Sequence, residues 1–474
     1  MFYILRGHEH EYEVQTIIQV FCPNGRYQRR DEPESGFGVE SYMEGARCVA
    51  VIYEDGSIVA SDECVIRFSG DKGEQQAVKA AIYGAFLRLG YGMQPWGILT
   101  GIRPAKIVHD LRRQGHDEKV KTVLLDEYLM SPEKAELCIT VARAEEGVLD
   151  RIPKDGVALY VGIPFCPTRC LYCSFTSFPA ERYTKKFGEY FGAVETELAA
   201  AKDYINSRKL NSVYVGGGTP TSIPGEYLER LLAYLRENFT IHDDTEFTVE
   251  AGRPDTVTAE KLWIMARYGV NRLSINPQTM NARTLEKIGR KHTPEDVIRA
   301  FGLAREAGFD NINADLIVGL PGENVSDVRN TFDQIEKLTP ESVTVHTLCV
   351  KRASELNRRL DEYGLADAAK TEAMLGAARE RCETMGLLPY YMYRQKNMLG
   401  NFENVGYCRP GRECAYNVMM MAERHDAIGA GAGAATKLMK EKGRIARVFG
   451  PKGVEEYIRR VGGVIQKKAE EGLL

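Results

Sequence analysis

Three cysteines lie within eight residues of one another, in the stretch YVGIPFCPTRCLYCSF that spans residues 160–175. They are Cys166, Cys170 and Cys173, in a C-x3-C-x2-C spacing. A zinc site normally combines two cysteine or cysteine/histidine clusters, and no second C-x2-C follows. Three thiolates suit an iron–sulfur cubane in which one iron lacks a protein ligand, because each iron is held by one cysteine. The spacing therefore predicts a [4Fe-4S] centre with an open iron.

The same spacing also fits three thiols on one face of a helix. Pro164 and Pro167 oppose this alternative, because proline has no amide donor and disfavours a continuous helix. We therefore expect the segment to loop around the metal centre. Most of the other cysteines are expected to be small core residues. Cys408 and Cys414 could bind a second metal, but no third ligand is evident, and ordinary thiols are the preferred interpretation.

The cysteine stretch resembles the radical S-adenosylmethionine (SAM) enzymes, which have an aromatic residue, here Tyr172, before the last cysteine. The surrounding IPFC…CxYCxF and the later GGGTPT are similar to the oxygen-independent coproporphyrinogen III dehydrogenase-like proteins. That group includes dehydrogenases, haem chaperones and related porphyrin-acting enzymes. The resemblance is good over residues 157–347 and looser in the C-terminal part. It implies a [4Fe-4S] cluster and SAM as cofactors.

From Val157 onward, short apolar runs alternate with long helical patterns, which predicts parallel strands covered by helices. The expected strands are Val157–Ile163, Ser212–Val215, Glu246–Glu250, Arg272–Ile275, Asn311–Val318 and Ser342–Thr347. The expected helices lie around Glu181–Ser207, Glu226–Asn238, Ala259–Tyr268, Pro294–Ala307 and Ser326–Leu338. Six such units match the partial (β/α)6 barrel that the resemblance implies. The predicted fold class is therefore α/β. In barrels of this kind the chemistry lies at the carboxyl ends of the strands.

A glycine triplet follows the second expected strand. By itself a triplet often marks only a tight turn, but glycines also let the backbone approach a ligand closely. In the family this loop seats the SAM amino group. The resemblance thus implies SAM contacts from Gly216, Gly217, Gly218 and Thr219.

Two carboxylates lie in or at the end of expected strands. A carboxylate there is costly to bury without a partner. The resemblance implies that Glu250 pairs with the methionyl ammonium or the ribose hydroxyls of SAM and that Asp315 takes the ribose hydroxyls. A structural ion pair from Glu250 to Arg253 or Arg272 is the alternative.

Further positions match the family one by one. Gln278 and Arg290 match SAM contacts, and Arg290 would reach the SAM carboxylate. Tyr160 matches the SAM-contacting tyrosine and is the candidate catalytic residue, while Tyr172 is a further candidate SAM contact. The chain departs from the family at Gly162, where a histidine is usual, so the role of that histidine is in doubt here.

The remaining segments are expected to be separate domains. Residues 1–90 form a small α+β domain with a hairpin, Arg47–Tyr53 and Ser57–Phe68, and a helix, Lys72–Leu89. Residues 91–152 are helical, with a helix start at Ser131 and Pro132, and end in a linker. The barrel covers 153–350 and a C-terminal substrate-side domain covers 351–474. A basic stretch at residues 101–113 could meet an anionic partner, although a solvated helix face is preferred.

After the barrel a helix is expected at Glu362–Met385, followed by the aromatic and basic run Leu388–Asn397. Aromatic area and cations suit a flat, carboxylate-rich substrate. Arg394 is the preferred carboxylate contact and Lys396 the second, because strand alternation would put both on one face. An ordinary strand with one wet face is the alternative. The glycines of residues 429–433 indicate close backbone packing.

The chain of 474 residues has a formal net charge of −4 and no long apolar run, which gives no sign of nucleic acid or membrane partners. We expect it to be cytoplasmic. The resemblance implies conversion of coproporphyrinogen III to protoporphyrinogen IX, with electrons from a flavodoxin or ferredoxin. A haem chaperone is the rival, although Tyr416–Met421 lacks the histidine and the aromatic pair of the chaperones' motif. A radical methyltransferase or ring-opening enzyme is a third possibility.

Overall fold

The structure is a computed structural model that describes residues 1–473, except residues 24, 68–69, 176 and 397. By compactness the chain divides into two units, Met1–Thr140 and Val141–Leu474. The four-part division expected from the sequence is finer than this and stays a prediction. Strands from 153–350 and from 351–474 nevertheless belong to one sheet.

A five-stranded sheet, in the order β2-β1-β3-β4-β5, is the centre of the first unit. Its strands are β1 (Phe2–Arg6), β2 (Gln28–Arg29), β3 (Phe37–Glu44), β4 (Arg47–Glu54) and β5 (Ser57–Val65). The predicted hairpin is confirmed: β4 and β5 pair antiparallel, and Asp55 and Gly56 between them have φ of 49° and 80°. Positive φ at both central residues is what a two-residue hairpin turn requires. Phe68, the predicted end of the second strand, lies outside the described residues.

The helices of the first unit are α1 (Glu11–Phe21), α2 (Asp71–Arg88), α3 (Ala105–Arg113) and α4 (Val120–Thr122), with the 3-10 segment η1 (Asp117–Lys119) and the π-helical segment η2 (Val123–Glu127). Helix α5 (Pro132–Leu149) begins in the first unit and ends in the second. Helix α2 matches the predicted helix to within one residue at each end. Helix α5 begins at Pro132 as predicted, and the Lys134 amide donates to Ser131 Oγ at 3.2 Å. This side-chain cap satisfies one of the free amides of the first turn.

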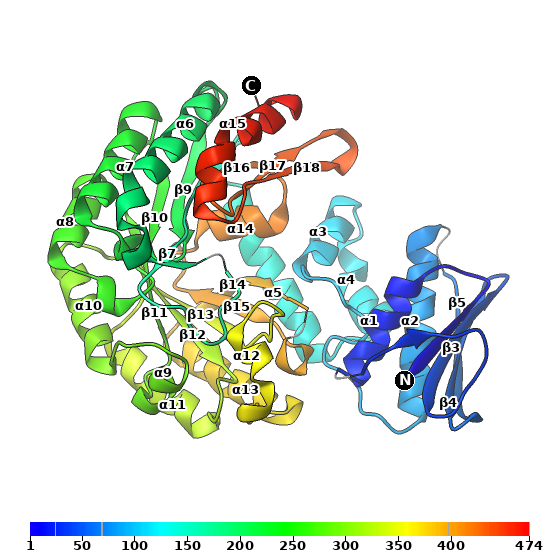
Figure 1. Ribbon diagram of the computed structural model, residues 1–474. Helices are drawn as coiled ribbons and strands as arrows, with labels where there is room; N and C mark the ends of the chain where they lie inside the picture. Colours follow the sequence, from blue (N-terminus) through cyan, green and yellow to red (C-terminus); the bar gives the residue numbers. More distant parts are fainter. Residues whose placement is uncertain (24, 68–69, 176, 397, 474) are drawn as a thin grey trace. The chain divides into compact units, whose positions relative to one another are not determined.

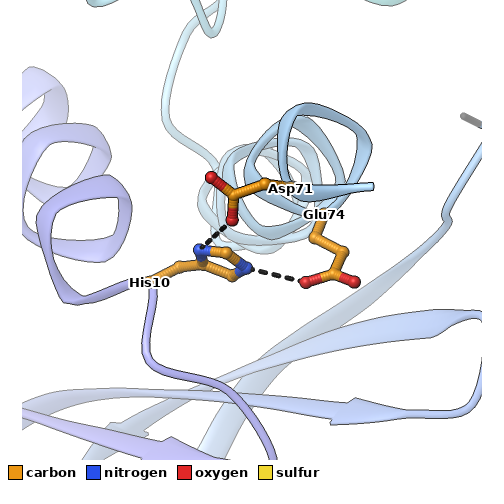
Figure 2. Close-up of side chains that lie close together, drawn as sticks. All are labelled: His10, Asp71 and Glu74. Atoms are coloured by element: carbon orange, nitrogen blue, oxygen red, sulfur yellow. Dashed lines mark hydrogen bonds and ion pairs between the residues drawn. The ribbon is translucent and has the colours of Figure 1, made fainter. Parts of the chain in front are cut away.

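One histidine links the first two helices of this unit. Figure 2 shows His10, which precedes α1, with Nε2 3.0 Å from Glu74 and Nδ1 3.8 Å from Asp71, both in the first turn of α2. A histidine with two carboxylates could hold a divalent cation. Here each ring nitrogen faces a separate carboxylate, so we interpret the group as a structural link between α1 and α2.

The second unit contains an eleven-stranded sheet whose middle part is the predicted partial barrel. Six parallel strands follow one another in the order in which they occur in the chain. They are β6 (Val157–Ile163), β9 (Leu210–Gly217), β10 (Glu246–Glu250), β11 (Arg272–Gln278), β12 (Ile312–Val318) and β13 (Ser342–Thr347). The predicted fold class, an α/β partial (β/α)6 barrel, is confirmed.

Helices cover the outer side of these strands (Figure 1). They are α6 (Phe187–Asn206), α7 (Gly225–Asn238), α8 (Ala259–Arg267), α9 (Ala282–Lys287), α10 (Pro294–Glu306) and α11 (Val325–Lys337). Residues 181–186, predicted as the start of the first helix, instead belong to the 3-10 helix η3 (Ala180–Lys186). Among the described residues, none of the helices is both long and apolar enough to cross a bilayer.

The C-terminal part extends this sheet at both edges. Strands β14 (Leu388–Tyr393) and β15 (Asn404–Cys408) add to β13, whereas β16 (Asp426–Ala430) pairs parallel with β6 and continues to β17 (Ala435–Met439) and β18 (Ile445–Phe449). The helices are α12 (Glu355–Arg358), α13 (Ala368–Thr384), α14 (Ala415–Ala422) and α15 (Val454–Glu470). Helix α13 begins later than the predicted Glu362, because Asp367 accepts the Lys370 amide and caps it.

A buried ion pair fastens α15 to the barrel. Lys468 Nζ lies 2.6 Å from Glu197 on α6, and both side chains are at most 3% exposed. Glu197 also accepts the Tyr457 hydroxyl and the Gly431 amide, at 2.5 and 2.9 Å. The loop after β16 and helix α15 are therefore held against α6 through these contacts.

We expect Glu197→Gln to destabilise the second unit strongly. Loss of the anion leaves the Lys468 ammonium buried and uncompensated, which costs about 3–5 kcal/mol. The unfolding midpoint in denaturant measures this. Glu189→Gln on the same helix is the matched control, because its partner Lys186 is exposed and such pairs contribute at most about 1 kcal/mol. Equal effects in both variants would contradict the assignment.

Candidate functional site

The three cysteines lie in a loop beyond the carboxyl end of β6. Cys166 ends the short strand β7 (Phe165–Cys166), which pairs with β8 (Phe178–Pro179). Cys170 and Cys173 follow in an irregular segment, where the Cys173 amide donates to the Cys170 carbonyl at 3.1 Å. The predicted loop is confirmed, and the alternative of one helical face is wrong.

All three cysteines line a single cavity of about 490 Å³. Burial raises the pKa of the Cys166 thiol to about 11, and it also raises the pKa of Cys173. A thiol of this kind stays protonated unless a cation compensates for the thiolate charge. Bound iron would supply that charge, so the environment suits metal ligands rather than a free nucleophile.

Most of the other predicted site residues surround the same cavity. Residues from β6, the cysteine loop, β9, β10, β11, β12 and the segments that follow them meet there, although they lie far apart in the sequence. The predicted lining residues are Tyr160, Tyr172, Gly217, Gly218, Thr219, Glu250, Gln278, Arg290 and Asp315. Gly216 does not line it.

The glycine triplet ends β9 in close contact with the cysteine loop. The Gly218 amide donates to Ile163 O at 2.7 Å, and a Cβ on Gly218 would lie 2.4 Å from Phe165 O. Gly217 has a φ of +114°, a backbone angle that residues other than glycine rarely adopt. The next residue, Thr219, has its hydroxyl 3.5 Å from Cys166 Sγ. The triplet thus lets the strand end reach the loop, whether or not it also touches a ligand.

Glu250 is a half-buried carboxylate without a cationic partner among the described residues. It accepts the Tyr214 hydroxyl at 2.7 Å and the Gly217 amide at 3.2 Å. The alternative ion pair is absent, since Arg253 bonds to Asp255 and Arg272 to Ser342. Burial raises the pKa of Glu250 to about 7. A cationic ligand group would stabilise this carboxylate in its charged form.

Asp315 lies on β12, which β11 separates from the strand of Glu250, and its surroundings differ from those of Glu250. Burial by itself raises its pKa, but the His346 side chain and hydrogen bonds from Asn313 and Thr344 bring the pKa below its ordinary value. His346 Nε2 is 3.7 Å from one carboxylate oxygen, and Asn313 donates to the other at 2.7 Å. The site therefore contains two different carboxylates. Asp315 stays charged, whereas Glu250 titrates near neutral pH.

Comparison with known proteins shows the family. The radical SAM superfamily model matches residues 160–335. The oxygen-independent coproporphyrinogen-III oxidase-like protein HemZ of Bacillus subtilis is 40% identical over 407 residues, which cover 83% of this chain and 81% of that protein. The chain belongs to the radical SAM superfamily. Within it, the chain is a member of the oxygen-independent coproporphyrinogen-III oxidase-like group.

Two further comparisons report what this radical SAM protein is similar to. The heme chaperone HemW of Bacillus subtilis is 32% identical, over 58% of this chain and 69% of that protein. The solved structure of coproporphyrinogen III oxidase (HemN) from Escherichia coli aligns with a TM-score of 0.54 at 23% identity, over 68% of this chain and 72% of that one. The latter likeness shows the fold alone.

A radical SAM protein uses a [4Fe-4S] cluster and SAM. The residues of this site fit both groups. Cys170 is buried and Cys166 and Cys173 are half-buried, and the three thiolates would hold three irons of the cluster, one each. Glu250 lacks a cation, which the SAM ammonium would provide. We therefore propose Cys166, Cys170 and Cys173 as the cluster ligands.

Three other predicted SAM contacts lie where a ligand could reach them. Tyr160 stacks on Tyr214 with ring centroids 6.1 Å apart. Gln278 ends β11 with φ of 70°, a strained conformation that is common at functional sites. Arg290 donates to the Asn276 carbonyl, and its charge neighbours Tyr172 and Cys170. Their roles in SAM binding stay proposals.

Gly162, where the resemblance led us to expect histidine, is crowded by the loop after β16. A Cβ there would lie 3.2 Å from the Ala432 carbonyl, and the Gly162 carbonyl accepts the Tyr190 hydroxyl at 2.6 Å. Gly431, with φ of +106°, packs against the same residue. The local backbone packing is a physical reason for glycine at this position.

The prediction that Arg394 and Lys396 face the substrate is wrong for this structure. Strand β14 ends at Tyr393, so alternation does not extend to these residues. Arg394 is 3% exposed and donates to the Asn401 carbonyl at 2.8 Å, whereas Lys396 is exposed. Neither lines the cavity, although Gln395 between them does.

One wall of the cavity, the aromatic wall, was predicted only in part. Tyr391 and Tyr393 belong to the aromatic run expected to face the substrate, and both line the cavity. Sequence reasoning missed the rest of this wall, which consists of Tyr214 and of the α14 residues Tyr416, Asn417, Met420 and Met421. Glu246 positions α14 by accepting the amides of Ala415 and Tyr416 at 2.7 and 3.2 Å. Tyr214 could have been found, because it lies two residues before Gly216 on the same strand face. No local signal placed α14 here.

Proposed function

We propose that this protein catalyses the oxygen-independent oxidative decarboxylation of coproporphyrinogen III to protoporphyrinogen IX. Each of two propionate groups would lose one hydrogen atom, one CO2 and one electron to become a vinyl group. When bound, the cluster and SAM supply the chemistry that removes a hydrogen atom from an unactivated carbon. A low-potential one-electron donor such as a flavodoxin or ferredoxin would keep the cluster reduced.

The observation that carries this proposal is the continuity of the cavity. The cysteine loop and the aromatic wall line the same space. A porphyrinogen is an apolar macrocycle with carboxylates at its rim, and the wall offers the flat apolar area that such a ring needs. Tyr214 and Tyr416 stack with ring centroids 4.5 Å apart and form a continuous aromatic surface there.

Glu250 and Asp315 would hold SAM, and the aromatic wall would position the macrocycle against it. Tyr391 and Tyr393 on β14 are stacked with centroids 6.4 Å apart, and Tyr393 contacts His346 at 3.3 Å. This packing fixes the side chains before substrate arrives. Binding of the macrocycle would also displace water from the site, which protects a reactive intermediate from side reactions.

Lys351 takes the place of Arg394 as the proposed carboxylate contact. It lines the cavity just beyond β13, and no carboxylate among the described residues lies within ion-pair distance of its ammonium. Its polar neighbour is the Cys349 thiol. Burial raises the pKa of this thiol, and the charge of Lys351 offsets only part of the rise. Arg253, by contrast, is already paired with Asp255. Lys351 is therefore available for a substrate carboxylate. We assign it a carboxylate that the substrate retains, because an ion pair would disfavour loss of CO2.

We expect Lys351→Met to raise the KM for coproporphyrinogen III about tenfold or more, since a charge-assisted hydrogen bond contributes about 1.5–3 kcal/mol. SAM cleavage without substrate should be unchanged. Lys396→Met is the matched control, because Lys396 is exposed and outside the cavity. An unchanged KM in Lys351→Met would refute this contact while leaving the reaction itself open to the test below.

The reaction is tested by anaerobic incubation with SAM, a strong reductant and coproporphyrinogen III, followed by mass spectrometry. Loss of two CO2 with two equivalents of 5′-deoxyadenosine supports the proposal. A methylated or ring-opened product would overturn the reaction and leave the cofactors in place. An unchanged tetrapyrrole in the presence of active SAM cleavage would also reject the decarboxylation.

A haem chaperone is the second candidate, on one specific observation. Met420 and Met421 of α14 line the cavity, and a methionine thioether can ligate haem iron. Stoichiometric haem binding that Met420→Leu and Met421→Leu together abolish, without any change in coproporphyrinogen III, would favour this candidate.

A further inference from the structure

Arg253 joins the end of β10 to the cysteine loop. It follows Glu250 by three residues and precedes the turn η5 (Pro254–Thr256). Its side chain is 2% exposed. One guanidinium nitrogen, Nη1, lies 3.1 Å from Thr168 Oγ1 and 3.8 Å from Cys170 Sγ. A buried cation thus donates to the sulfur of a proposed cluster ligand.

The rest of the guanidinium is fixed in place by a carboxylate. Nε and Nη2 donate to the two oxygens of Asp255 at 3.0 and 3.1 Å, a two-pronged arrangement that sets the orientation of Nη1. Burial by itself raises the pKa of Asp255, but these bonds bring the pKa below its ordinary value. His292 lies beside the pair, and burial lowers its pKa to about 4, so it is neutral at physiological pH.

Charges and hydrogen bonds at cluster sulfurs are among the features that set the reduction potential of an iron–sulfur centre. Uptake of one electron makes the cluster more negative by one charge. A fixed donor on a ligand sulfur stabilises that added charge, and it does so most strongly where water is excluded. Arg253 meets both conditions.

We propose that Arg253 is a positioning residue that raises the reduction potential of the cluster through its contact with Cys170 Sγ. The inference concerns the cofactor and not the reaction, so it stands or fails independently of the proposed function. Thr219, at 3.5 Å from Cys166 Sγ, is a neutral counterpart on another ligand.

The test measures the midpoint potential of the reconstituted cluster by anaerobic titration, followed by electron paramagnetic resonance, without SAM or tetrapyrrole. In Arg253→Gln the ratio of reduced to oxidised cluster at a given potential should fall about tenfold, which is about 59 mV for a one-electron couple. Arg253→Lys should recover most of this shift, because it retains the charge. Rescue of this kind separates an electrostatic role from a merely structural one.

Arg169→Gln is the matched control. Arg169 belongs to the same loop, but it is exposed and donates to the carbonyls of Ala353 and Cys173 rather than to a sulfur. Water screens its charge, so the potential should stay at the wild-type value. An unchanged potential in Arg253→Gln, or an equal shift in both variants, would overturn the proposal.

Asp255→Asn keeps the inference testable if Arg253→Gln fails to assemble a cluster. Removal of the anion leaves the guanidinium charge uncompensated beside Cys170, so the potential should move in the positive direction. No shift, or a negative one, would overturn the proposal.

Discussion

We expect replacement of Cys166, Cys170 or Cys173 by alanine to abolish the [4Fe-4S] cluster. Each cysteine is expected to bind a different iron, so loss of one thiolate leaves two irons without a protein ligand instead of one. Wild-type protein reconstituted without oxygen should contain about four iron and four sulfide per chain. Each of the three variants should lack the absorption and the paramagnetic signal of the reduced cluster.

Two control variants test whether the loss is specific. Cys349 lines the same cavity but lies outside the loop, so Cys349→Ser should retain the cluster. The double replacement Cys408→Ala and Cys414→Ala should also retain it, because Cys414 Sγ instead donates to Glu246 at 3.2 Å. A full cluster in any one of the three loop variants would contradict the assignment of the ligands.

We expect replacement of either carboxylate at the strand ends to weaken SAM binding without loss of the cluster. Glu250→Gln removes the anion that the SAM ammonium would meet, and Asp315→Asn removes the acceptor proposed for the ribose hydroxyls. Each charge-assisted hydrogen bond contributes about 1.5–3 kcal/mol, so the affinity should fall roughly ten- to a hundredfold. Isothermal calorimetry with the reconstituted protein measures this. Unchanged affinity in both variants would mean that the carboxylates are structural.

The dependence on pH distinguishes the two carboxylates. The pKa of Glu250 is raised to about 7, so it becomes neutral and loses its attraction for the ammonium as the pH falls. From pH 7.5 to pH 6 the affinity of wild-type protein for SAM should fall roughly fivefold. Asp315, whose pKa is lowered, stays charged over this range. Asp315→Asn should therefore retain the pH dependence, and Glu250→Gln should lose it; the reverse pattern would exchange their roles.

Short-range patterns in the sequence determined the cysteine loop and the six parallel strands. Proline at 164 and 167 excludes a helix locally, and the alternation of apolar runs with helical patterns depends only on neighbouring residues. Cys166, Glu250 and Asp315 could be predicted as parts of one site because the carboxyl ends of parallel strands meet at one edge. Family resemblance supplied the cofactors.

Contacts between distant segments were decided only by the tertiary structure. Arg394 appeared to continue the face of a strand, yet β14 ends one residue earlier and the side chain turns to the Asn401 carbonyl. Arg253 was a candidate partner for Glu250, but it bonds to Asp255 and approaches Cys170 instead. Where a strand ends, and which partner a side chain bonds to, both depend on the segments that the fold brings close to them.

The aromatic wall shows most clearly that the sequence does not reveal which distant segments come into contact. Helix α14 reaches the cavity because Glu246, at the start of β10, caps it across 169 positions of sequence separation. Strand β16, which follows the barrel in the sequence, pairs with β6, the first strand of the barrel. This pairing brings Gly431 against Gly162. Sequence periodicity reports which face of an element is buried, but not which element covers it. The residues proposed to bind the cofactors could therefore be predicted from the sequence. The residues proposed to bind the substrate are brought to the cavity by the packing of the C-terminal part.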